Sequence, residues 1–163
     1  MTDEAPAIFM AIEGSAFAAM VRQSPFAYMA ANVAHILSLM VFFGAVAIMD
    51  LRLAGFFKAT APATILRGAR RVAIVGFFGL IASGAMLFAA EASHIILNPM
   101  FRIKLILILL GLINIAVFEF VLARKISDVP PLAPLPGSAR FVGMASIAIW
   151  LAVAACGRLI AYF

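Results

Sequence analysis

Residues 103–123 read IKLILILLGLINIAVFEFVLA, with Lys104 near the start and Glu119 near the end as the only charged side chains. A helix of about 20 apolar residues is long enough to cross the hydrocarbon core of a bilayer, which is roughly 30 Å thick. Lipid offers the backbone no hydrogen-bond partners, so such a segment must pair its own N–H and C=O groups along a helix. This stretch therefore predicts a transmembrane helix.

Three further stretches have the same apolar character. Together with the first they predict membrane spans at about residues 26–50, 70–92, 102–124 and 140–161. The chain is 66% hydrophobic and 12% charged, whereas soluble domains are about half apolar and about a quarter charged. We therefore predict an all-α integral membrane protein in which residues 1–163 form a single four-helix bundle.

The segment before the first span is too short to cross a membrane. Ile8, Phe9, Ile12 and Met20 recur there at roughly helical spacing. This pattern predicts an amphipathic helix at residues 6–23 that lies on the outer membrane surface.

The distribution of basic residues predicts the orientation of the bundle. Eight of the twelve lysines and arginines lie between spans one and two or between spans three and four. The positive-inside rule places such loops in the cytoplasm. We therefore predict a multi-pass protein of the bacterial inner membrane with both termini in the periplasm. Basic residues spread between apolar runs are not typical of a nucleic-acid-binding surface.

Small residues occur on two spans at the spacing of one helix face. Gly76, Gly79 and Ser83 lie on the second span, and Gly143 and Ser146 lie on the fourth. Small side chains at such intervals allow two helix backbones to approach closely in lipid. The pattern predicts a tightly packed bundle.

His35 is the most conspicuous polar residue inside a span. A titratable group in lipid is costly and marks a candidate functional site. At about 1.5 Å per residue, Asn114, Trp150, Ser83 and Gly84 lie at nearly the same depth as His35. This predicts a small polar pocket around His35, with Asn114 and Trp150 as its other candidate cofactor-binding residues. His35 has three interpretations here: a structural histidine bonded to Asn114 or a backbone carbonyl, a ligand of haem or a divalent metal, or part of a proton relay.

A second set of charged residues lies toward the cytoplasmic ends of the spans. Glu119 is expected to pair with Arg52 or Arg70, and a weaker alternative makes it a metal ligand with His35. Asp50 and Arg52 mark the predicted inner end of span one. We expect both to face the membrane interface.

The outer ends of the spans carry a further polar cluster, in which snorkelling cations and terminal aromatic residues explain most members. Its members are Glu91, His94, Asn98, Arg102, Lys104, Arg158 and Tyr162. His94 and Glu91 form a weak second candidate for a metal or partner site. His94 lies about 15 Å from the level of His35, which disfavours one haem held by both histidines.

Four short motifs, taken together, resemble a known family. They are Ser24-Pro25-Phe26, Asp50-Leu51-Arg52-Leu53, Asn98-Pro99-Met100-Phe101-Arg102-Ile103-Lys104 and Gly157-Arg158-Leu159-Ile160-Ala161-Tyr162. The chain resembles an uncharacterised family of bacterial four-helix inner-membrane proteins, known only as a domain of unknown function. In general layout it is also similar to the membrane parts of copper-resistance proteins and to small cytochromes b.

The resemblance implies the fold and gives weight to particular motif positions. Those positions are His35, Arg52, Lys104 and Arg158. In the family a histidine often follows the phenylalanine of span three, whereas here Glu119 follows Phe118. This departure weakens the interpretation as a haem protein.

The sequence contains no nucleotide-binding loop, nucleophile elbow or zinc-protease motif. We therefore favour a non-enzymatic accessory or structural subunit of a membrane redox or transport assembly. The alternative is an electron-transfer protein that binds haem b or a divalent metal through His35, and a third is a small transporter that uses His35 and Glu119. The expected partners are the lipid bilayer, other membrane subunits or a periplasmic protein, and a second copy of the chain.

Overall fold

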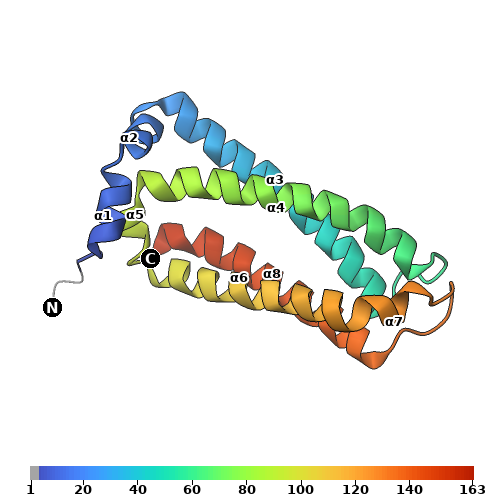
Figure 1. Cartoon of the computed structure of the whole chain (residues 1–163). Helices are drawn as coiled ribbons and strands as arrows, with labels where there is room; N and C mark the ends of the chain where they lie inside the picture. Colours follow the sequence, from blue (N-terminus) through green and yellow to red (C-terminus); the bar gives the residue numbers. More distant parts are fainter. Residues whose placement is uncertain (1–3) are drawn as a thin grey trace.

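The computed structural model describes residues 4–163 and consists of four long helices with short helices at both ends (Figure 1). The four spans are α3 (Pro25–Ala54), α4 (Pro62–Ala90), α6 (Pro99–Val117) with its continuation to Ser127, and α8 (Gly137–Leu159). Each is long and apolar enough to cross a membrane. The predicted all-α membrane fold is confirmed.

The sequence specifies where these helices start and stop. Proline stands at the first position of α3, α4 and α6, where its missing N–H costs no hydrogen bond. The Ser24 hydroxyl caps α3, and the Asn98 side chain caps α6 by accepting hydrogen bonds from two backbone N–H groups. Gly55, at φ +106°, ends α3 in the left-handed conformation that glycine tolerates. Helix α3 therefore continues past the inner end expected near residue 50.

Helix α3 lies at the centre of the packing. Both α4 and α8 pack against it, and α6 packs against α8. A Cβ atom at Gly76 would lie 2.7 Å from the backbone nitrogen of Phe42, and one at Gly143 would lie 2.8 Å from the Cβ of Leu53. The predicted close approach at these small residues is confirmed.

Helices α4 and α6 do not form a packed pair in the described part of the chain. Helix α4 meets the third span near both ends of that span. At one end the ring of Phe88 stacks on the ring of Phe101 at a centroid distance of 5.4 Å, and at the other end α4 contacts α7 (Ala123–Ser127). Between these two contacts the ribbons of α4 and α6 lie apart (Figure 1). This separation leaves the bundle open on one side.

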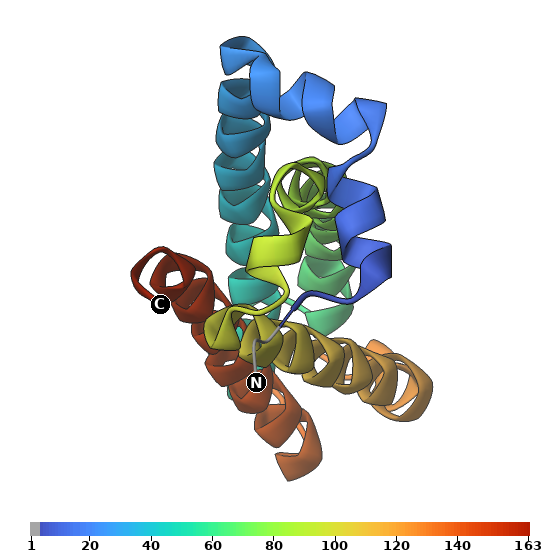
Figure 2. The same cartoon turned by 90° about the vertical axis from the view of Figure 1, so that its left-hand side faces the viewer.

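The N-terminal segment forms two helices rather than the single one expected at residues 6–23. Helix α1 (Ala7–Glu13) and helix α2 (Ala16–Gln23) are separated by Gly14 and Ser15. The break has a local cause, because the Ser15 hydroxyl accepts a hydrogen bond from Ala18 and starts a new helix. Both helices lie across one end of the bundle (Figure 2).

Three contacts attach these short helices to the bundle. Phe9 packs edge-on against Phe88 at a centroid distance of 6.0 Å, and Arg22 donates a hydrogen bond of 2.8 Å to the carbonyl of Ala90. Glu13 accepts two hydrogen bonds from Ser93 on α5 (Ala92–Ile95), one from the backbone N–H at 2.8 Å and one from the hydroxyl. The hydrogen bonds from Ser93 lower the pKa of Glu13 below its ordinary value of 4.5.

We predict that Gly76→Ala destabilises the protein by about 1–3 kcal/mol, because the added methyl group pushes α4 away from the backbone of Phe42. The measurement is thermal unfolding in detergent, followed by circular dichroism. Gly68→Ala on the same helix is the control, since nothing lies within 4 Å of its Cβ position. That variant should be neutral or stabilised by up to about 1 kcal/mol. Equal stability of the two variants would contradict the packing described.

The Glu13 contact predicts a pH-dependent attachment of α1 to α5. The lowered pKa means that the contact stabilises docking fully above pH 4.5 and loses this contribution as the pH falls through the docked-state value. Hydrogen exchange of residues 91–96, corrected for intrinsic rates, should therefore accelerate below pH 4.5. In Glu13→Gln the exchange should be faster at neutral pH and should show no such step. A step that persists in Glu13→Gln would assign it to another group.

Candidate functional site

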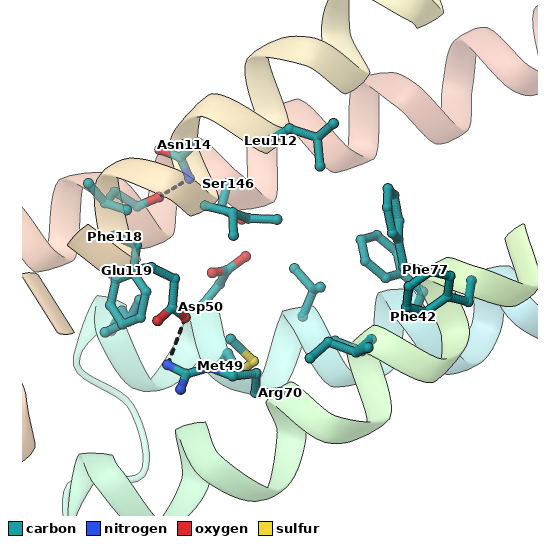
Figure 3. A pocket seen from close by; sticks show the side chains of 17 residues that line it. Phe42, Met49, Asp50, Arg70, Phe77, Leu112, Asn114, Phe118, Glu119 and Ser146 are labelled. Atoms are coloured by element: carbon teal, nitrogen blue, oxygen red, sulfur yellow. Dashed lines mark hydrogen bonds and ion pairs between the residues drawn. The ribbon is translucent and has the colours of Figure 1, made fainter. Parts of the chain in front are cut away.

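A cavity of about 240 Å³ lies between the four spans, on the open side of the bundle (Figure 3). Most of its wall is apolar, and its polar groups come from α3, α4, α8 and the third span. The lining residues are Phe42, Val46, Met49, Asp50, Leu53, Arg70, Ala73, Ile74, Phe77, Phe78, Leu112, Asn114, Ile115, Phe118, Glu119, Val142 and Ser146. An apolar cavity with a few polar groups is the usual form of a small-molecule site.

Asp50 supplies a carboxylate to this cavity from α3. Its side chain is only 5% exposed, and its Oδ2 atom has no hydrogen-bond partner among residues 4–163. Figure 3 shows the carboxylate pointing into the cavity. A buried polar atom without a hydrogen-bond partner costs free energy. The Oδ2 atom of Asp50 is therefore a candidate contact for a bound ligand.

Glu119 reaches the cavity from a π-helical turn, η1 (Phe118–Leu122), which interrupts the third span. Its Oε1 atom lies 2.7 Å from the Nη2 atom of Arg70 on α4. The expected ion pair is confirmed with Arg70 as the partner. Both side chains are about one-third exposed, so the pair stands at the mouth of the cavity. Single π turns occur frequently at functional sites.

Asn114 and Ser146 complete the polar part of the wall. The Asn114 amide donates a hydrogen bond of 3.2 Å to the carbonyl of Val142, which joins α6 to α8 (Figure 3). Ser146 lies on α8 and is buried. Asn114 lies on α6 and Ser146 on α8, two helices that pack against each other.

Of the residues expected around His35, Ser83 and Gly84 lie against its ring, whereas Asn114 and Trp150 have other partners. Asn114 lines the cavity, whereas His35 and Trp150 are not among its lining residues. Trp150 packs edge-on against Phe42 at 4.7 Å and occupies the space that Gly111 leaves open. His35 lies 2.9 Å from the hydroxyl of Ser83 on α4. A ligand role for these residues stays a prediction.

The hydrogen bonds around Ser83 set the proton positions on His35. The Ser83 hydroxyl donates to the carbonyl of Gly79 at 2.6 Å. Its oxygen is therefore free to accept a hydrogen bond from the Nδ1–H of His35. In this tautomer the Nε2 atom of His35 keeps its lone pair, as in histidines that bind metals.

Asp50 and Arg52 do not face the membrane interface as expected. Asp50 lines the cavity, and the Arg52 side chain is 1% exposed, with its Nε atom donating to the carbonyl of Thr60 at 3.2 Å. Both are buried because α3 continues to Ala54. The loops beyond it are joined by a hydrogen bond of 2.8 Å from the Leu132 N–H to the Lys58 carbonyl.

The residues of the outer cluster are distributed over several local contacts. The Arg102 side chain donates to the carbonyl of Ile96, and Arg158 lies over the ring of Tyr162 while donating to its hydroxyl. The side chain of Lys104 lies beside Gly157 on α8. Within residues 4–163, no three or more His, Cys, Asp or Glu side chains gather as a metal site, and a metal role for His94 and Glu91 stays a prediction.

The sequence pattern did not predict the cavity positions of Asp50 and Ser146. A usable signal was present, because the apolar residues Leu51, Leu53 and Ala54 continue after Asp50 to Gly55. An acidic residue followed by more apolar sequence lies inside a helix rather than at its end.

A family model matches residues 9–163, which is nearly the whole chain. The chain belongs to DUF6644, a family of unknown function. This confirms the resemblance to an uncharacterised family. No curated protein and no solved structure matches the chain.

Proposed function

We propose that this DUF6644 protein is a ligand-binding module of a bacterial inner-membrane assembly, with the cavity as its binding site. The observation that carries the proposal is the Asp50 carboxylate, which points into an apolar cavity with one oxygen atom unpaired. In this role the chain is an accessory subunit rather than an enzyme. The ligand supplies the interaction that Asp50 lacks.

The open side of the bundle supports entry of the ligand from the bilayer. Phe78 and Ile74 on α4 line the cavity and are 66% and 50% exposed. They therefore stand at its mouth, where α4 and α6 diverge. A molecule dissolved in lipid reaches Asp50 through this opening without crossing a polar surface.

The distribution of basic residues supports an orientation for the site. The end of the bundle formed by the α3–α4 and α7–α8 loops carries five basic residues: Lys58, Arg67, Arg71, Arg124 and Arg140. The positive-inside rule places this end in the cytoplasm and both termini in the periplasm. The charged wall of the cavity then belongs to the cytoplasmic half of the membrane.

We predict that Ala73→Phe blocks ligand binding, because Ala73 lines the cavity and the larger side chain fills it. The full chain is extracted with its native lipids and analysed by native mass spectrometry for a small molecule that stays bound after lipids are stripped. Wild type should retain such a mass, and Ala73→Phe should lose it.

Ala82→Phe is the matched control, since Ala82 lies on the exposed face of the same helix. It should retain the bound mass. A wild-type protein that carries no small molecule, or an equal mass in Ala73→Phe, would contradict the ligand-binding role. The same spectra test the accessory role, because release of the chain without any stoichiometric subunit would count against it.

A second candidate function is binding of haem or a metal through His35. Its support is the lone pair that the Ser83 contact leaves on Nε2. If His35 is such a ligand, the purified protein should show a Soret band that shifts on reduction with dithionite, or near-stoichiometric metal by elemental analysis. His35→Ala should then lose the signal, whereas His94→Ala should keep it. A colourless, metal-free protein from cells supplied with haem and metals would exclude this candidate.

A further inference from the structure

The charges that line the cavity do not balance. Three lining side chains are ionisable: Asp50, Arg70 and Glu119. Arg70 is engaged by Glu119 at 2.7 Å, which leaves Asp50 as the one lining carboxylate without an opposite charge in this part of the structure. The wall of the cavity therefore carries one excess negative charge when all three groups are ionised.

Arg52 is the nearest other cation in sequence, but it does not restore the balance. Its side chain is not part of the cavity lining, and its Nε atom is directed to the carbonyl of Thr60 beneath the α3–α4 loop. Asp50 and Arg52 are two residues apart on a helix, so their side chains leave α3 in different directions. The Asp50 carboxylate is thus left for a partner that enters the cavity.

The remainder of the wall is suited to an aromatic or aliphatic group next to a cation. Phe42, Phe77, Phe78 and Phe118 all line the cavity. The faces of aromatic rings carry partial negative charge and attract cations, most strongly where water is excluded. The volume of about 240 Å³ is sufficient for a small amphiphile but not for a whole lipid.

We propose that the ligand of this cavity is a small amphiphile with a single positive charge, an organic ammonium, whose cationic group pairs with Asp50 and whose apolar part lies among the phenylalanines. This inference rests on the ligand-binding function proposed above. The structure assigns Arg70 and Glu119 a different role, in which they close the cytoplasmic side of the mouth with a neutral pair. The cavity therefore selects a ligand by the positive charge that pairs with Asp50 and by the fit of the ligand's apolar part among the phenylalanines.

Three probes with the same carbon skeleton test the charge preference directly. They are 4-phenylbutylamine, 4-phenylbutanol and 4-phenylbutyrate, which differ in a cationic, neutral or anionic terminal group. Their binding to the full chain in lipid nanodiscs is measured by calorimetry. The fluorescence of Trp150, which packs against the cavity residue Phe42, provides a second signal. Empty nanodiscs give the partitioning of each probe into lipid.

We expect the amine to bind at least about tenfold more tightly than the alcohol after correction for partitioning, and the anion to bind most weakly. Tenfold corresponds to about 1.4 kcal/mol. In Asp50→Asn the preference for the amine should fall to about twofold or less. Asp128→Asn removes the same kind of charge outside the cavity and should leave the preference unchanged.

Failure of this inference and failure of the ligand-binding role give different results. Equal binding of amine and alcohol to wild type, both abolished by Ala73→Phe, overturns the cationic ligand and retains the cavity as a site for a neutral molecule. Tightest binding of the anion overturns it in favour of recognition by Arg70. Binding of none of the probes, or binding that Ala73→Phe does not alter, overturns both proposals. The comparison of probes on wild type decides the matter even if Asp50→Asn does not fold.

Discussion

Two close crossings of one helix determine the arrangement of the whole bundle. Helix α3 meets α4 at Gly76 and α8 at Gly143, and at both points a Cβ atom would lie within 3 Å of α3. In lipid, where no hydrophobic effect drives helices together, such close contact between backbones supplies much of the attraction. Because α6 joins the bundle through α8, no similar contact brings α6 against α4. The cavity and its lateral opening exist because α3 packs closely against α4 and α8, whereas α4 and α6 have no such close backbone contact.

The apolar runs were sufficient to predict the four spans, since their length and the absence of charge leave a helix as the only solution in lipid. They did not predict the helix ends. The charged pair Asp50 and Arg52 predicts the inner end of the first span, yet α3 continues to Ala54 and buries Arg52, whose Nε atom donates to the loop carbonyl of Thr60. The single helix expected at residues 6–23 is divided because Ser15 caps a new helix, which the spacing of the apolar residues alone does not indicate.

The candidate site was harder to predict than the fold. Counting residues along a span gives depth in the membrane but not the direction in which a side chain points. His35, Asn114 and Trp150 were grouped by depth, and the structure gives each a different partner. A span that is apolar on all sides provides no polar stripe to mark its inward face. The Glu119–Arg70 pair was predictable because a charged side chain within a membrane span is costly unless it pairs with an opposite charge.

The π-helical turn at Phe118–Leu122 also affects how relatives of this protein should be aligned. In an α-helix, residues five apart point about 140° away from each other, whereas the wider i to i+5 pairing of a π turn brings them closer to one face. The Phe118 carbonyl accepts the N–H of Ala123, five residues on, and Glu119 lies within this turn. The turn thus behaves as a one-residue insertion in the third span. Beyond Leu122, a relative with an uninterrupted helix would match each residue in space with a neighbouring position in the sequence. An ungapped alignment would then compare side chains that face different surroundings.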